Sequence, residues 1–127
     1  MSRCQLCGRR LGTLKSGLIR SHHFKQTLCS GSGHWPIEEC DQQLEISATL
    51  AAQREEILRL ELAELFERRA NWIEPRIYSD LLAASKEADR LGRRLVRHRA
   101  WPERFARQME QQGWGDPPPA YLQRLAQ

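Results

Sequence analysis

The chain of 127 residues is poor in strand-forming side chains, with a single valine and only three threonines. Because strands are enriched in β-branched residues, this scarcity argues against a large sheet. Leu, Ile, Val and Phe together make up 27 residues, about 21% of the chain, which is near the lower limit for a well-buried core. We therefore expect a mostly α-helical protein that needs a metal, helix pairing or a partner for stability.

Long apolar runs are also missing. No stretch approaches the roughly 20 apolar residues that cross a bilayer, and no signal-peptide pattern opens the chain. We therefore expect a cytoplasmic protein with no membrane partner. In that compartment cysteines bind metal more often than they form disulfides, so the four cysteines are candidate ligands.

Catalytic motifs are scarce as well. The sequence has no phosphate-binding loop, no paired carboxylates and no nucleophile motif. His22-His23 beside cysteine pairs has a faint similarity to an HNH nuclease, but the separate Asn and the second C-x2-C pair of that family are missing. We therefore do not expect an enzyme.

Acidic residues are absent from residues 1–36, which carry six basic side chains. The rest of the chain holds 14 basic and 16 acidic residues, so the positive charge is concentrated at the N-terminal end. Such a field attracts nucleic-acid phosphates without a sequence code. The alternatives are scattered, solvated charges or an acidic protein surface. The predicted phosphate contacts are Arg9, Arg10, Arg20 and Lys25.

The segment Cys4-Gln5-Leu6-Cys7-Gly8 is typical of a metal-binding turn. Two thiolates separated by two residues reach one ion from the same loop, and Gly8 can adopt the positive φ that this geometry needs. Five further residues could complete a tetrahedral site. The first choice is C-x2-C-x14-H-x6-C, with a structural Zn²⁺ bound by three sulfurs and one imidazole. These ligands are Cys4, Cys7, His22 and Cys29, and the reserve ligands are His23, His34 and Cys40.

The same residues resemble a small zinc-binding motif that recurs in bacteriophage proteins. In that motif a C-x2-C-G-R pair is followed by a glycine-led strand that ends in histidine, and then by a C-P-G-S-G turn. Here these parts correspond to residues 4–9, 17–22 and 29–33, with Ser30 in place of the proline. The resemblance covers about a quarter of the chain. It implies the same four ligands and a phage or prophage origin, and it implies no specific activity.

The expected fold class is mostly α, with a zinc-ribbon-like module over residues 1–36 and a helical domain over residues 37–127. Within the module, residues 9–24 are expected to form a hairpin around Lys15-Ser16-Gly17. Pro36 marks the boundary before the first long helix, which is expected to end near Trp72. A second helix is expected to follow Pro75 and to end near Arg99. Short helices are expected at about 102–112 and 118–126.

Apolar residues at alternating steps of four and three predict that the two long helices pair as an antiparallel hairpin over about 37–99. The rival is a coiled-coil homodimer with the first helices parallel. A second apolar stripe is expected to widen the buried face of the first helix. The predicted contacts join Leu58, Leu62 and Leu65 to Leu81, Leu91 and Leu95, and the second stripe is Ile46, Leu50, Ile57 and Leu60.

A second basic stretch lies at 90–99, with Arg104 and Arg107 beyond it. We expect its arginines to pair with acids of the first helix. The sequence as a whole favours a small zinc-stabilised regulatory protein whose basic module binds nucleic acid. The alternative is a phage-type adaptor or inhibitor that binds a host protein through its helices and never contacts nucleic acid. The salt dependence of binding distinguishes the two hypotheses, because phosphate binding weakens steeply with ionic strength.

Overall fold

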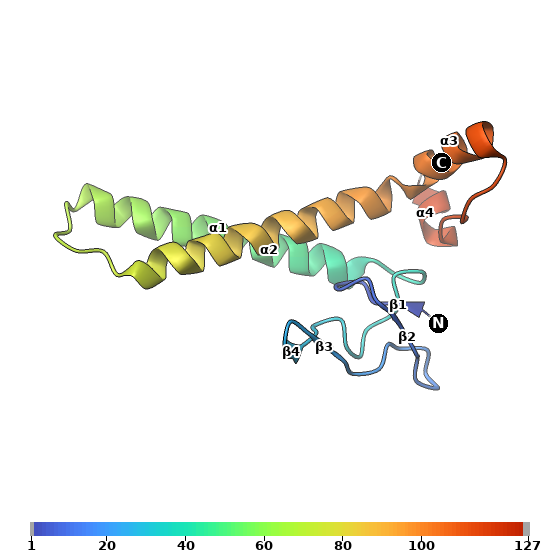
Figure 1. The fold of residues 1–127 in the computed structure, drawn as a ribbon, viewed down its shortest axis with the longest axis horizontal. Helices are drawn as coiled ribbons and strands as arrows, with labels where there is room; N and C mark the ends of the chain where they lie inside the picture. Colours follow the sequence, from blue (N-terminus) through green and yellow to red (C-terminus); the bar gives the residue numbers. More distant parts are fainter. Residues whose placement is uncertain (1, 126–127) are drawn as a thin grey trace. The chain divides into compact units, whose positions relative to one another are not determined.

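The computed structural model describes residues 2–125 and is mostly helical (Figure 1). Within this range, four helices follow four two-residue strands. The strands are β1 (Ser2–Arg3), β2 (Arg10–Leu11), β3 (His23–Phe24) and β4 (Thr27–Leu28). The helices are α1 (Gln42–Glu67), α2 (Pro75–Arg99), α3 (Trp101–Gln112) and α4 (Ala120–Leu125). The expected preponderance of helix is confirmed.

The chain forms two compact units. One contains Met1–Leu44 and Leu95–Gln127, and we call it the terminal unit. The other is Glu45–Arg94, which we call the hairpin unit because it consists of most of α1, the connecting loop and most of α2. Residues 37–44 and the last part of α2 therefore cluster with the basic N-terminal module.

Short antiparallel pairs shape the N-terminal module. β1 pairs with β2 through Ser2 and Leu11, and β3 pairs with β4 through His23 and Leu28. The hairpin expected over residues 9–24 is reduced to its turn, where Leu14 N–H donates to the Leu18 carbonyl at 2.8 Å, and to one isolated bridge. Gly17 adopts φ +91° in this turn. Strands of two residues are sufficient to hold the loops of this module beside one another.

The core of the terminal unit combines ligand residues with a few aliphatic ones. Ile19 and Leu44 are fully buried, and Leu122 of α4 is 2% exposed. Trp35 is 48% exposed, and its ring lies against Gly17. A Cβ at Gly17 would come within 3.0 Å of that ring, so glycine lets the aromatic side chain rest on the backbone of the turn.

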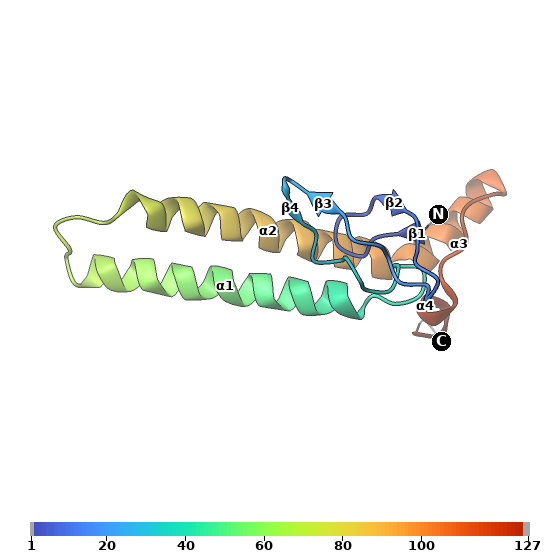
Figure 2. The same cartoon turned by 90° about the horizontal axis from the view of Figure 1, so that it is seen from below.

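In the hairpin unit α1 and α2 run antiparallel and lie side by side in both views (Figures 1 and 2). The stripe predicted to face the partner helix is the less exposed one, and Ala84 and Leu91 of α2 are buried. The second stripe was expected to widen the buried face, and this expectation is wrong. One helix packed on one neighbour covers a single face, so the second stripe is left 44–64% exposed: Ile46, Leu50, Ile57 and Leu60.

The boundaries of α1 also differ from expectation. The helix begins at Gln42 rather than next to Pro36, because residues 37–40 form a separate turn in which Cys40 N–H donates to the Pro36 carbonyl at 3.2 Å. Its C-terminal end lies at Glu67, and Arg69 follows in the left-handed region at φ 52°. Propensity alone does not reveal either end, since nothing in 37–41 or 68–72 forbids helix.

The boundaries of α2 and α3 lie close to those expected. Pro75 occupies the first position of α2, where its missing N–H costs nothing. Gly113 ends α3 at φ 76° and donates its N–H to the Met109 carbonyl. The predicted span of the last helix, 118–126, runs past the described residues at position 126. No helix in the described part of the chain is long and apolar enough to cross a membrane.

Only one of the ion-paired arginines of α2 described below pairs with the segment expected to form the first helix. Arg90 pairs with Glu87 at 2.8 Å and Arg93 with Asp89 at 3.2 Å, so both contact acids of their own helix. Arg99 reaches Asp41 at 3.1 Å, just before α1 begins. Acids one turn away on the same helix are nearer than those on a neighbouring helix, which explains the local pairing.

Candidate metal centre

The four residues predicted as metal ligands lie together in the terminal unit. One ligand atom from each of them falls within 4.8 Å of all the others. Cys4 and Cys7 come from the loop between β1 and β2, His22 directly precedes β3, and Cys29 directly follows β4. The Cys4 and Cys29 sulfurs are 3.8 Å apart, and the Cys7 sulfur is 3.4 Å from His22 Nε2. Four ligand atoms at these separations can bind one metal ion.

The Cys4–Cys7 turn has the conformation that its sequence predicts. Gly8 adopts φ 76°, and its N–H donates to the Cys4 carbonyl at 3.1 Å. Cys4 N–H in turn donates to the Arg9 carbonyl at 3.0 Å, which closes the loop between β1 and β2. An L side chain rarely adopts this φ, so glycine after the second cysteine allows both sulfurs to lie on one side.

His22 is oriented by hydrogen bonds to its other ring nitrogen. Its Nδ1 lies 2.9 Å from the Arg20 carbonyl, which can only accept, so Nδ1 carries the proton. Ser32 Oγ accepts from His22 N–H and donates to the His22 carbonyl. Nε2 is left with its lone pair directed at the cysteine sulfurs. This is the tautomer that a metal-bound histidine needs.

Gly31 is the second glycine that the site requires, and here the reason is space. A Cβ at this position would lie 2.2 Å from the Cys4 sulfur, far inside van der Waals contact. Ser32 N–H donates to the Cys29 carbonyl at 3.0 Å, so the backbone turns tightly over the ligand cluster. The Ser-Gly-Ser-Gly stretch is therefore an ordered turn that packs against the metal ligands.

The thiols have different acidities. Burial alone would raise the pKa of the Cys7 thiol, but hydrogen bonds from the backbone and side chain of Arg9, together with the contact to Cys4, outweigh it and lower the pKa to about 7. Burial, together with the neighbouring Cys4 and Cys7, raises the pKa of the Cys29 thiol to about 12. Three thiols this close resist losing all their protons unless a cation compensates the charge. A divalent metal provides that compensation.

Gln5 is a residue that the sequence analysis missed. Only 2% exposed, it lies inside the Cys4–Cys7 turn. Its Oε1 accepts a 3.0 Å hydrogen bond from Leu44 N–H, and its Nε2 donates to the Trp35 carbonyl at 2.8 Å. Leu44 lies in the first turn of α1, where backbone N–H groups lack helical partners. The metal-binding turn therefore caps the start of the long helix.

The reserve ligands lie outside the cluster formed by the described residues. Cys40 instead accepts a hydrogen bond from Gln42 N–H at 3.4 Å, so its sulfur caps the start of α1. His23 is exposed on β3, and the His34 carbonyl accepts from Ile19 N–H. The neighbour of a ligand in sequence need not be a ligand, because successive side chains of an extended chain point to opposite sides.

The four residues predicted to contact phosphate are all exposed. None of them takes part in an ion pair with another of residues 2–125. Arg9 differs from the rest, because it donates to the His23 carbonyl and hydrogen-bonds the Cys7 sulfur. It therefore supports the metal centre. Arg10, Arg20 and Lys25 have no such role.

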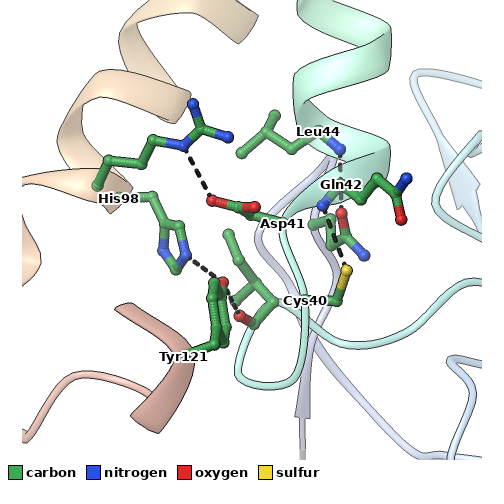
Figure 3. Close-up of polar contacts among 9 residues, drawn as sticks. Cys40, Asp41, Gln42, Leu44, His98 and Tyr121 are labelled. Atoms are coloured by element: carbon green, nitrogen blue, oxygen red, sulfur yellow. Dashed lines mark hydrogen bonds and ion pairs between the residues drawn. The ribbon is translucent and has the colours of Figure 1, made fainter. Parts of the chain in front are cut away.

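A polar cluster joins the C-terminal helices to the segment before α1 (Figure 3). Tyr121 of α4 donates its hydroxyl proton to the Ile37 carbonyl at 2.7 Å and accepts from His98 Nε2 at 2.5 Å. His98 and Asp41 are 6% and 8% exposed, and Asp41 accepts from Arg99 at 3.1 Å. Burial raises the pKa of Tyr121, and the negative charges of Asp41 and Cys40 raise it further. The buried imidazole of His98 is therefore hydrogen-bonded to Tyr121.

Comparison with known proteins gives no relative. No protein-family model, curated protein or solved structure matches the chain.

Proposed function

We propose that the chain is a small regulatory protein in which a structural Zn²⁺ organises a module that binds nucleic acid. Three cysteine sulfurs and one imidazole within 4.8 Å suit the tetrahedral coordination and N/S preference of zinc. All four protein ligands are present, which leaves no open position for substrate. The metal would therefore stabilise the fold and supply no chemistry.

The observation that carries the binding proposal is a set of exposed cations without acidic partners. Arg10, Arg20 and Lys25 lie on the module, and none is ion-paired within residues 2–125. Lys25 sits at the turn between β3 and β4 in the left-handed region at φ 52°, and its exposed ammonium lies 5.5 Å from the centroid of the Phe24 ring. Arg20 N–H donates to the Gly12 carbonyl, so the backbone at Arg20 lies beside the residue that follows β2.

Phosphates are the partner that this surface favours. When unpaired protein cations contact the phosphates of a nucleic acid, they displace the counterions condensed there. The release of these counterions favours binding and needs no recognition of the bases. The described module also has no helix that could serve as a recognition helix in the major groove. We therefore expect binding with little preference for sequence.

The test uses the zinc-loaded chain and fluorescence anisotropy with duplex DNA, single-stranded DNA and RNA at several salt concentrations. The variant Arg10→Gln/Arg20→Gln/Lys25→Gln leaves Arg9 in place, because Arg9 supports Cys7. Binding should weaken, and the log–log salt slope should flatten by up to about three units. Arg59→Gln is the control, since Arg59 is paired with Glu55 on α1. No binding of any probe at low salt would overturn the proposal.

A second candidate function rests on the exposed stripe of α1. Ile46, Leu50, Ile57 and Leu60 place four large apolar side chains in water on one side of the helix. Such a face suits a helix of a host protein or of a second copy, as in the adaptor or inhibitor alternative and in the homodimer. Binding through it should persist at high salt. Leu50→Ser/Ile57→Ser should abolish it without affecting nucleic-acid binding, and sedimentation of the chain alone identifies the homodimer.

A further inference from the structure

Arg97, Arg104 and Arg107 form a group of cations at the junction of α2 and α3. Arg97 lies in the last turn of α2, and Arg104 reaches back from α3 to donate a 2.8 Å hydrogen bond from Nη2 to the Arg97 carbonyl. Arg107 follows one turn later on α3, on the same side as Arg104. All three belong to the terminal unit and lie outside the N-terminal module.

The three arginines lack acidic partners. No ion pair joins any of them to another of residues 2–125, whereas Arg90, Arg93 and Arg99 nearby are each paired with an acid. The closest acids along α3, Glu103 and Glu110, form no ion pair with them either. Their positive charges are therefore left uncompensated by the protein.

Part of the Arg104 guanidinium is also shielded from water. Its Nε is buried and has no hydrogen-bond partner among the described residues. Burial lowers the pKa of its guanidinium, and the positive charges of Arg97 and Arg107 lower it further. A guanidinium carries five N–H donors, and the bond to the Arg97 carbonyl uses one. The remaining donors gain most from an oxyanion, which supplies acceptors and negative charge together.

Capping of α2 explains only part of the arrangement. A cation in the last turn and a donor to the last carbonyls both stabilise a helix C-terminus, which accounts for Arg97 and Arg104. It does not account for Arg107, which lies beyond the end of α2 and increases the repulsion. Three like charges held near one another without a counter-charge are costly unless an anion binds between them.

We propose that Arg97, Arg104 and Arg107 form a binding site for a phosphate group. Arginine is suited to this ligand because its planar donors match two phosphate oxygens at once. The group can come from free inorganic phosphate or from the backbone of a nucleic acid, which share this chemistry. The site is separate from the cations at Arg10, Arg20 and Lys25, so it stands whether or not the N-terminal module binds nucleic acid.

The test follows the arginine Nε–Hε signals by NMR in the metal-loaded, ¹⁵N-labelled full chain. Inorganic phosphate is titrated against sodium chloride at matched ionic strength. The signals of Arg97, Arg104 and Arg107 should shift and saturate, while that of Arg59 should not. Equal, non-saturating shifts at all arginines would indicate screening alone and would overturn the proposal if the oligonucleotide arm below also fails.

The variant Arg107→Gln tests the site without disturbing the fold, since Arg107 is exposed and caps nothing. Phosphate affinity should fall at least about tenfold, as expected for the loss of one charge-assisted contact. Arg93→Gln is the matched control, an exposed arginine already paired with Asp89, and should not change the affinity. Equal affinity in the wild type, Arg107→Gln and Arg93→Gln would refute the assignment.

A short oligothymidylate is the second probe and identifies the source of the phosphate. Saturable shifts with free phosphate alone assign the site to a small anion. Shifts with the oligonucleotide that Arg107→Gln abolishes assign it to a nucleic-acid backbone. The Arg10→Gln/Arg20→Gln/Lys25→Gln variant should retain these local shifts, which separates this site from the proposed function. Response to neither probe would overturn the inference.

Discussion

The hydroxyl of Tyr121 donates a 2.7 Å hydrogen bond to the backbone carbonyl of Ile37, 84 positions earlier in the chain. The bond joins α4 to the segment that links the metal module with α1. Because His98 Nε2 donates to the same hydroxyl, one phenol connects three parts of the sequence (Figure 3). The terminal unit therefore contains two polar clusters, the candidate metal ligands and the group around Tyr121.

The first prediction concerns the metal ligands. Cys4→Ser should abolish stoichiometric zinc and unfold the N-terminal module, because folding of such a module is coupled to metal binding. Most of the helical circular dichroism should remain, since most of α1 and α2 belongs to the hairpin unit, which contains none of the ligands. Zinc content by mass spectrometry gives the answer. Cys40→Ser is the matched control and should retain one zinc, because Cys40 caps α1. Full zinc in the Cys4 variant would contradict the site.

The second prediction concerns the glycine that covers the sulfurs. Gly31→Ala would place a Cβ 2.2 Å from the Cys4 sulfur, so the turn must move and the affinity for zinc should fall. Competition with a zinc chelator measures that affinity. Gly92→Ala is the control, because nothing lies within 4 Å of its Cβ. In α2 it should raise the free energy of unfolding by up to about 1 kcal/mol and leave zinc affinity unchanged. Equal zinc affinity in both variants would show that Gly31 has no role in the site.

The third prediction compares two apolar residues of α1. Leu44 is fully buried, so Leu44→Ala should lower the free energy of unfolding by about 2–5 kcal/mol. Ile57 is 64% exposed, and Ile57→Ala should change it by less than about 1 kcal/mol. Leu62, at the predicted helix contact, is half-buried and should fall between the two. Urea denaturation of the three variants measures the order, and a large loss at Ile57 would mean that its face is covered by a second copy.

The fourth prediction is a pH dependence of stability. The pKa of Tyr121 is raised in the folded chain, so the folded state holds the phenol proton more tightly than the unfolded state, where the pKa is about 10. The stabilisation is complete below pH 10 and is lost as pH rises through the raised pKa. Tyr121→Phe removes the phenol and with it this pH-dependent contribution to the free energy of unfolding. The stability difference between wild type and this variant, measured by urea denaturation, should narrow above pH 10.

Tyr78→Phe controls for that experiment, because Tyr78 is 46% exposed on α2. Its stability difference from the wild type should stay constant from pH 8 to pH 11. A constant difference for Tyr121→Phe as well would show that the tyrosine hydroxyl is not held by the cluster.

Short-range patterns in the sequence determined much of the candidate metal centre. The spacing Cys4-x2-Cys7 followed by glycine predicts a tight turn with φ > 0, and Gly8 has φ 76°. The prediction succeeds because the turn is formed by five consecutive residues, and because glycine has only a hydrogen atom as its side chain and so adopts this φ without strain. Helix periodicity likewise predicted α1 and α2 and the antiparallel hairpin, since it needs only the repeat of apolar positions along the chain.

Other features depended on contacts between segments far apart in the sequence. The exposure of the second stripe of α1 could not be predicted, because both stripes repeat every three or four residues and only the position of α2 decides how wide a face is covered. The same holds for Gln5, whose hydrogen bond to Leu44 spans 39 positions, and for Tyr121, whose polar partners come from two other segments. Arg97, Arg104 and Arg107 lie in a basic stretch of the sequence, but only the tertiary structure separates them from the arginines that have acids within reach. A charge is compensated by whatever lies within a few ångströms, and that neighbourhood is set by folding rather than by the order of residues.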